Sequence, residues 1–141
     1  SNIVKLTAGG SSTSPQWSPD GEKIVFQYWN HKDPVQIHVM KSDGNELTQI
    51  THTQTTYYQP SWSPNGHKIV YQSDQDSGDG IYDIYIMDVN GSNRTRVTPV
   101  DERSDTEPLW SPDGSKILFK SLLPNNAIEF RILDNVDIWF K

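Results

Sequence analysis

The sequence predicts an all-β protein built from repeated four-stranded units, and three observations support this fold class. The pattern P-x-W-S-P-[DN]-G-x-K-I occurs three times, within residues 15–26, 60–71 and 108–119. Its tryptophans lie 45 residues apart and then 48 residues apart, a period typical of solenoids, propellers and other repeat arrays. Nine glycines, nine prolines and 11% aromatic residues suit many short strands joined by tight turns.

The first complete unit, residues 13–51, is expected to contain four strands. The pattern places them at 14–17, 23–29, 35–41 and 46–51. Between the first two strands, Ser18-Pro19-Asp20-Gly21 has the composition of a tight turn, because proline sets φ at the second position and glycine accepts positive φ at the fourth. Asp43-Gly44 predicts the hairpin turn between the third and fourth strands.

Two further units follow in the same order. The second, residues 58–98, repeats all four strands, with Asn90-Gly91 at its second hairpin turn. The third, residues 106–141, is expected to have strands at 107–110, 116–121 and 136–140, with a long connection at 122–135. The chain then stops without a fourth strand.

The missing strand has a counterpart at the start of the chain. Residues 2–7 (NIVKLT) read as a strand whose end resembles the Q-I-T and R-V-T endings of the first two units. In closed β-propellers an N-terminal strand completes the last blade. Residues 1–7 are therefore expected to form a closing strand for a blade that lacks its outer strand.

These repeats resemble the TolB-type β-propeller repeat (WD40-like, PD40), whose pattern is roughly P-x-W-S-P-D-G-x-K-I-x-F followed by D-I-Y-x-M, D-G-S-N and L-T. The middle part stands here as D-I-Y-I-M at 83–87 and D-I-W-F at 137–140. The resemblance implies a single propeller domain over residues 1–141, a non-enzymatic role in binding proteins or peptides, and a periplasmic or extracellular location. The chain departs from the family in blade number, because those propellers usually have six or more blades and this chain supplies three.

Three blades leave two apolar faces without a neighbour, because each repeat buries its faces only against adjacent repeats. Propeller rings close at about four to eight blades. One hypothesis is a homodimer, in which each chain is half of a six-bladed ring and its N-terminal strand completes the third blade of the other chain. The alternative is a piece of a longer propeller cut at a repeat boundary. The sequence favours the homodimer.

Function is expected where the blades differ. The turns within the repeated pattern are short and lie on one face of the ring, whereas the loops between second and third strands and between blades are longer and lie on the other, here named the long-loop face. Binding residues concentrate in such loops on a rigid scaffold. The candidate binding residues on this face are Trp29, His31, His52, Tyr57, Tyr58, Asp101, Arg103 and Asp105.

Two metal hypotheses are open. Asp74, Asp76 and Asp79 lie in one loop and could supply oxygen ligands to Ca²⁺, the one candidate cofactor; the alternative is a solvated acidic loop. His31 and His52 lie on the long-loop face, and the resemblance extends to propeller lyases that hold a divalent metal with histidines. An enzyme of that class, acting on carbohydrate, is the alternative function.

The remaining features favour structure over chemistry. The repeated tryptophans are expected to pack between blades, because each blade has one in the same position. No nucleophile elbow, phosphate-binding loop or dinucleotide fingerprint is present, so no catalytic residue is predicted. A role as the accessory propeller of a peptidase would need a hydrolase domain elsewhere. The net charge of −6 argues against a nucleic-acid partner, and no apolar run approaches the roughly 18 residues of a membrane span.

Overall fold

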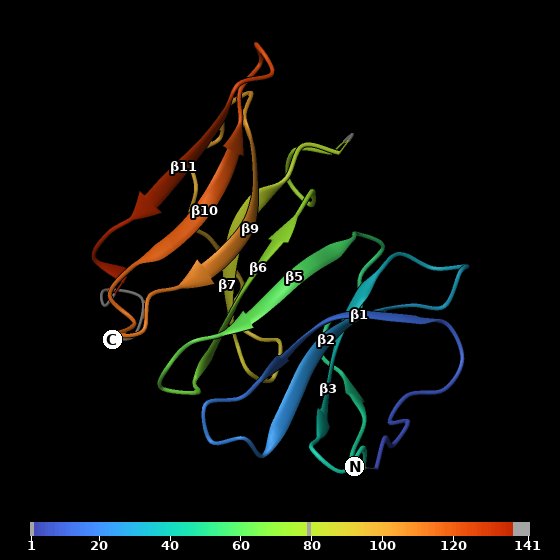
Figure 1. Cartoon of the computed structure of the whole chain (residues 1–141). Coiled ribbons are helices and arrows are strands. Elements are labelled where there is room, and N and C mark those ends of the chain that lie inside the picture. The colour runs from blue at the N-terminus through green and yellow to red at the C-terminus, as the bar shows by residue number, and fades with distance from the viewer. Residues whose placement is uncertain (1, 79, 137–141) are drawn as a thin grey trace.

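The computed structural model describes residues 2–78 and 80–136. In this part of the chain eleven strands form three antiparallel sheets, which fan out from a common inner side (Figure 1). Blade 1 consists of β1 (Ser11–Trp17), β2 (Lys23–Trp29), β3 (Gln36–Lys41) and β4 (Thr48–Gln49). Blade 2 consists of β5 (Tyr57–Trp62), β6 (Lys68–Ser73), β7 (Asp83–Asp88) and β8 (Thr95–Arg96). Blade 3 consists of β9 (Ser104–Trp110), β10 (Ile117–Leu122) and β11 (Ile128–Leu133).

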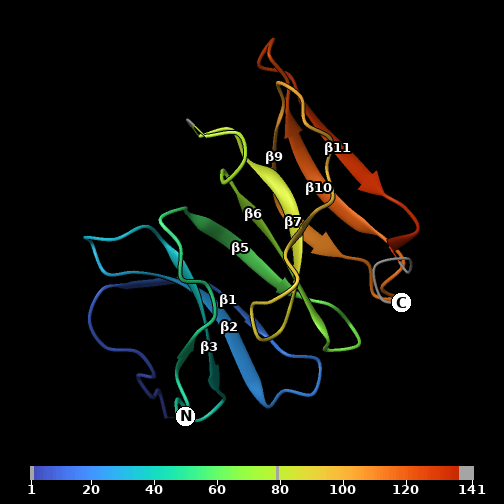
Figure 2. The same ribbon diagram turned by 180° about the vertical axis from the view of Figure 1, so that it is seen from behind.

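The strand order within each sheet follows the chain, so each blade is a meander with its first strand innermost. The inner strands β1, β5 and β9 lie beside one another, and the outer strands point away from them (Figure 2). This arrangement confirms the predicted all-β propeller architecture.

The turn after each inner strand has the predicted chemistry. The Gly21 N–H donates to the Ser18 carbonyl at 2.9 Å, and Gly21 has a φ of 73°. The Ser18 hydroxyl donates to Asp20 at 2.5 Å and accepts the Lys23 N–H at 2.9 Å. The turns at 63–66 and 111–114 repeat these bonds, so Asp20 and its equivalents are turn-forming residues.

Every inner strand also carries a β-bulge at the residue before its proline. Ser14, Gln59 and Glu107 occupy this position with φ values of 52°, 53° and 55°, and the pairing with the second strand shifts register there. A positive φ is uncommon for residues other than glycine. The bulge therefore recurs because the blade geometry requires it.

The core lies between blades. Each blade has a trailing face, which packs on the next blade, and a leading face, which packs on the preceding one. Val25 and Ile37 on the trailing face of blade 1 cluster with Ile69 and Tyr71 on the leading face of blade 2. We call this contact joint 1–2. Joint 2–3 repeats it with Val70, Ile84 and Ile86 of blade 2 against Ile117 and Phe119 of blade 3.

The two end faces of the half-ring differ from these joints in exposure. Leu118, Phe130 and Ile132 form the trailing face of blade 3 and are 40%, 76% and 57% exposed, whereas Val25 and Val70, the equivalents of Leu118, are fully buried. On the leading face of blade 1, Trp17 is 61% exposed, whereas its equivalent Trp62 is 9% exposed. The trailing face of blade 3 thus presents apolar surface of the kind that the joints bury. On the leading face of blade 1 Trp17 is exposed, whereas Ile24 and Phe26 are buried in a cluster with Leu6.

No strand forms over residues 2–7, which were expected to close a blade. Half-buried Leu6 nevertheless packs on the leading face of blade 1, and a Cβ added to Gly44 would lie 3.3 Å from its Cδ2. At joint 1–2, Gly91 stands against Ile50, the residue that follows β4. Leu6 therefore stands where the outer strand of a preceding blade belongs. No strand forms because no neighbouring strand is there to pair with it.

The third strand of blade 3 also differs from the prediction. It is β11, which pairs with β10 from Ile117↔Leu133 to Leu122↔Ile128 in the same register as β7 on β6. The sequence placed a connection at 122–135 and the strand at 136–140; residues 137–140 lie outside the described residues, and Val136 is buried just after the strand. Residues 128–133 and 136–140 are alternative partners for the same edge of β10, and the alternating apolar residues of β11 favour the first. The comparison of repeated motifs did not take this alternation into account.

Candidate functional site

A hollow of about 420 Å³ lies on the long-loop face between blades 1 and 2. We call it the aromatic groove. It combines two of the predicted binding residues, Trp29 at the end of β2 and Tyr58 near the start of β5. Its other lining residues come from the same two blades and are mostly small or polar: Ser11, Thr13, Gln27, Pro34, Val35 and Thr56. Such a mixture can hold an apolar side chain while offering hydrogen bonds to a peptide backbone.

The Trp29 side of the groove is fixed by its own loop. Trp29 is 43% exposed and packs against the His31 ring, with centroids 4.4 Å apart. His31 has a φ of 68°. The following turn is held by Asn30, whose Oδ1 accepts the N–H groups of Lys32 and Asp33 at 2.9 and 2.8 Å. The indole is therefore presented to solvent on a short, hydrogen-bonded loop.

The Tyr58 side is fixed by joint contacts. The Tyr58 ring is half-buried and makes an edge contact with Tyr82, with centroids 5.7 Å apart. Burial raises the pKa of Tyr82, and its N–H donates to Ser104 Oγ at 3.1 Å. These contacts orient Tyr58 before any ligand arrives.

Tyr57, which was predicted as a binding residue, does not line the groove. It is 1% exposed and packs on Tyr71, with ring centroids 5.5 Å apart. Its hydroxyl contacts Thr53 Oγ1 at 2.7 Å and accepts from Arg94 Nη1 at 3.1 Å. Successive residues of a strand face opposite sides, so Tyr57 faces joint 1–2, whereas Tyr58 pairs with Gln72 and packs on Tyr82.

Asp105, which was also predicted as a binding residue, lines neither this groove nor the hollow beside Asp101. It is 2% exposed, and its carboxylate accepts the hydroxyl of Ser121. Burial raises its pKa, and the nearby charge of Asp101 adds to that effect. Asp105 thus belongs to joint 2–3 and stands in the position that Tyr57 has in joint 1–2.

Asp101 and Arg103 lie in the loop between β8 and β9. Together with residues 123–125 they line a shallow hollow of about 630 Å³ on blade 3. Their side chains form an ion pair, and Asp101 also accepts the Arg103 N–H at 2.9 Å. Partial burial alone would raise the pKa of Asp101, but the bonds from Arg103 hold it below its ordinary value. His52 is exposed and lines neither hollow.

The candidate calcium loop is organised by protein contacts. Asp76 is exposed and accepts the buried Tyr85 hydroxyl at 2.7 Å, whereas Asp74 is half-buried. Asp79 lies outside the described residues. Among residues 2–78 and 80–136, no three histidine, aspartate or glutamate side chains are placed to hold a metal ion. Neither the calcium set nor a site built on His31 and His52 gains support from this geometry.

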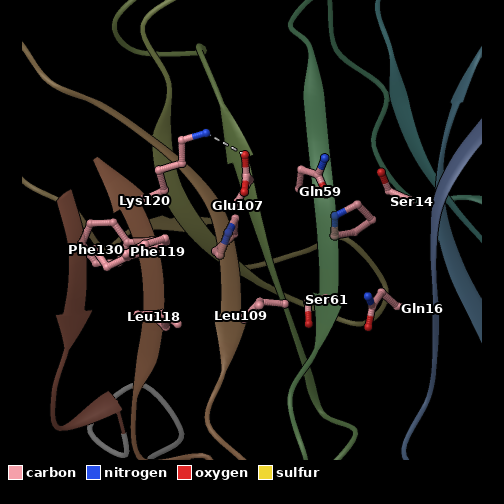
Figure 3. A pocket seen from close by; sticks show the side chains of 12 residues that line it. Ser14, Gln16, Gln59, Ser61, Glu107, Leu109, Leu118, Phe119, Lys120 and Phe130 are labelled. Atoms are coloured by element: carbon pink, nitrogen blue, oxygen red, sulfur yellow. Dashed lines mark hydrogen bonds and ion pairs between the residues drawn. The ribbon is translucent and has the colours of Figure 1, made fainter. Parts of the chain in front are cut away.

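A third hollow, of about 310 Å³, lies on the concave inner side of the half-ring (Figure 3). Its polar wall is made by the bulge residues Ser14, Gln59 and Glu107, and Lys120 pairs with Glu107 at 3.1 Å. Leu109, Leu118, Phe119 and Phe130 close it on blade 3. The sequence analysis missed these residues; the signal that could have found them is the residue before proline in each repeat, which differs from blade to blade.

No helix among the described residues has the length and apolarity needed to cross a lipid bilayer.

Comparisons with known proteins agree with the architecture. The chain matches the family described as TolB beta propeller domain over residues 2–98. A putative TolB from Agrobacterium tumefaciens is 25% identical, with a TM-score of 0.80, over 92% of this chain and 47% of that one. TolB from Acinetobacter baumannii is 21% identical, with a TM-score of 0.75, over 92% of this chain and 32% of that one. An oligogalacturonate lyase in complex with manganese is 21% identical, with a TM-score of 0.70, over 99% of this chain and 40% of that one.

A comparison with curated proteins gave no match. The chain spans about half the length of the Agrobacterium structure and less of the other two, and the more distant likenesses show the fold alone. The family match is more specific, because it covers both complete blades and the segment that precedes them. With three repeats of the same motif in three sheets of the same topology, the chain belongs to the TolB β-propeller (PD40) family.

Proposed function

We propose that this chain is a non-enzymatic binding module that holds an extended peptide or protein segment on its long-loop face. The observation that carries the proposal is the aromatic groove, where Trp29 and Tyr58 flank a hollow of about 420 Å³. Aromatic side chains bury large area at low entropic cost and dominate many protein interfaces. The predicted residues that are buried, Tyr57 and Asp105, serve as the support of this face rather than as contacts.

The hydrogen-bonding groups of the groove suit a peptide. Gln27, Ser11 and Thr13 line it beside the two rings, so amide and hydroxyl groups stand next to aromatic surface. Asp101 and Arg103 extend the same face on blade 3 as an ion pair. A segment that crosses from blade 1 to blade 3 would meet apolar surface first and charged surface second.

The proposal includes a ring made of two copies. The exposed trailing face of blade 3 and the leading face of blade 1, on which Trp17 is exposed, are the two halves of a joint that the chain already forms twice. Two chains related by a two-fold axis would close six blades, and Leu6 already stands in the place of an outer strand. A periplasmic or extracellular location is proposed with it, on the resemblance to the TolB family.

Among the alternatives, a divalent-metal carbohydrate lyase has the weakest support, because the described residues contain no converging metal ligands. The likeness to a manganese-bound lyase is at 21% identity and supports the fold. A thermal-shift series with Ca²⁺, Mn²⁺ and Zn²⁺ tests both metal hypotheses, since an ion that binds the folded state raises the melting temperature. A role beside a peptidase domain would place the same groove in a larger protein.

The groove is tested with a phage-displayed library of random peptides. We expect selected peptides to bind the wild-type chain and to lose at least about tenfold in affinity on Trp29→Ala or Tyr58→Ala. His67→Ala is the matched control, because His67 follows a short turn on the opposite face and should leave affinity unchanged. Peptides that bind all four proteins equally would contradict the groove, as would a library that yields no binder.

A further inference from the structure

A polar bond is repeated at both joints of the chain. The Gln27 side-chain oxygen, on β2 of blade 1, accepts the N–H of Gln59 on β5 of blade 2 at 3.0 Å. The Gln72 side-chain oxygen, on β6 of blade 2, accepts the N–H of Glu107 on β9 of blade 3 at 2.8 Å. Both donors are the positive-φ residues of the inner-strand bulges. We call this bond the carboxamide lock.

A second bond at each joint uses backbone atoms alone. The Tyr57 N–H donates to the Val35 carbonyl at 3.0 Å, and the Asp105 N–H donates to the Tyr82 carbonyl at 2.7 Å. This bond does not depend on a side chain, so any blade of the family can make it. The carboxamide lock, by contrast, needs an acceptor at one position of the second strand.

Blade 3 has a lysine at that position. Strand pairing shows the equivalence, since Gln27 pairs with Thr13, Gln72 with Tyr58 and Lys120 with Thr106. An ammonium group donates hydrogen bonds and accepts none. Lys120 instead pairs with Glu107 of its own blade (Figure 3). The third trailing face therefore carries the apolar residues of a joint without the acceptor of the lock.

The neighbour that fits this face is the leading face of blade 1 on a second copy. Its Ser14 has the same bulge and a φ of 52°, like Gln59 and Glu107, so its N–H would stand where the lock belongs. Trp17 on that face is 61% exposed. The joints within the chain supply the pattern for this contact, because each seats a leading face on a trailing face of the same kind.

We propose that blade 3 of one copy binds blade 1 of a second copy through a joint that lacks the carboxamide lock, and that the ring opens at this joint. The inference rests on the proposed two-copy ring and specifies its weakest contact. Opening there leaves each half-ring intact, because joints 1–2 and 2–3 keep their locks.

The test compares two variants of the full chain, Lys120→Gln and Lys120→Leu, by sedimentation equilibrium and by amide hydrogen exchange of Ser14. Glutamine supplies the missing hydrogen-bond acceptor. Leucine removes the positive charge and the ion pair with Glu107 but supplies no acceptor. One restored hydrogen bond should tighten each joint about fivefold, and because a two-fold ring has two such joints the dimer should tighten about 25-fold. In Lys120→Gln the Ser14 amide should also exchange more slowly than in wild type or in Lys120→Leu.

The inference is overturned if Lys120→Gln dimerises no more tightly than Lys120→Leu, if the Ser14 amide is equally protected in all three proteins, or if wild type and Lys120→Gln both stay monomeric at every concentration. Peptide binding at the aromatic groove is measured separately. That groove lies between blades 1 and 2 of one chain. A failure to bind peptide would therefore not affect the comparison of the Lys120 variants, and a negative result with the Lys120 variants would not affect peptide binding.

Discussion

Joints 1–2 and 2–3 have the same backbone and different interiors. At the equivalent position of the inner strand, joint 1–2 has Tyr57 and joint 2–3 has Asp105, both nearly inaccessible. Tyr57 continues a stack with Tyr71 and Tyr85, whose rings lie 5.6 Å apart and nearly parallel. Asp105 instead meets the Ser121 hydroxyl. The repeat thus fixes how blades meet, while the residue inside each joint is free to vary in chemistry.

The carboxylate of Asp105 gives joint 2–3 a cost that Tyr57 does not give joint 1–2. Burial raises the pKa of Asp105. A buried carboxylate is stabilising only when its partners offset the lost hydration. We therefore expect joint 1–2 to supply more of the stability and joint 2–3 to supply the pH dependence.

The largest effect is expected from Tyr71→Ala. Tyr71 is fully buried between Tyr57 and Tyr85, and truncating a buried aromatic side chain costs about 3–5 kcal/mol. Urea unfolding followed by tryptophan fluorescence measures the loss. Phe119→Ala, at the equivalent position of joint 2–3, should cost less, because its neighbours there include Asp105 instead of a second ring. Equal losses would remove the proposed difference between the joints.

Glycine-to-alanine substitutions compare joint 1–2 with the leading face of blade 1. A Cβ added to Gly91 would lie 1.9 Å from the Ile50 carbonyl oxygen, whereas one added to Gly44 would lie 3.3 Å from the mobile end of Leu6. Both glycines have a φ of 87°, so alanine would cause the same backbone strain at either position. Gly91→Ala should cost about 3 kcal/mol and Gly44→Ala about 1 kcal/mol, as read from denaturation midpoints. If Gly44→Ala lost as much stability as Gly91→Ala, this would contradict the looser contact of Leu6 with Gly44.

The carboxamide lock gives the next effect. Gln72 is 7% exposed, so Gln72→Leu leaves the Glu107 N–H without its acceptor and should destabilise the chain by about 1–3 kcal/mol. Gln27 is more exposed, and water can replace its bond to Gln59. Gln27→Leu should therefore cost less in the same unfolding experiment, and the reverse order would show that the lock is not what holds joint 2–3.

The smallest effect is a pH dependence. Because the folded pKa of Asp105 lies above its ordinary value, its contribution is fully present below that ordinary value and is lost as pH rises through the folded pKa. Asp105→Asn should remove this loss, so the variant gains stability over wild type as pH rises from acidic to neutral.

Asp113→Asn is the control of opposite sign. The Ser111 hydroxyl and the Ser115 N–H lower the pKa of Asp113 to about 2, so its contribution is present above its ordinary pKa and is lost as pH falls through about 2. Asn65 occupies the same position in blade 2, so the variant should fold. If the stability of wild type and of Asp105→Asn changed in parallel with pH, this would contradict the assignment of pH dependence to joint 2–3.

Much of the fold could be predicted because the repeat encodes local geometry. The turn at Ser18–Gly21 and the strand at Lys23–Trp29 follow from residues that act on their own backbone, and both are confirmed. Residues 2–7 and the third strand of blade 3 could not be predicted in this way. Their structure depends on which strand lies beside them, and that is a property of the assembly rather than of the segment.

The candidate site could also be predicted only in part. Trp29 and Tyr58 were predicted for the long-loop face and lie together in the aromatic groove. Tyr57 and Asp105 were predicted there because neither repeats, yet both occupy one repeated position that also holds Ser12 in blade 1. A position can vary between blades because it lies in a joint of different chemistry, so variation alone does not indicate a ligand.

The central claim is that this chain is half of a ring. Native mass spectrometry combined with small-angle scattering tests it most directly, over a range of protein concentrations. We predict a species of twice the 16.1 kDa mass of one chain, with the compact profile of a closed disc, that dissociates on dilution into intact half-rings. A monomer at every concentration, with the trailing face of blade 3 still open, would contradict the account.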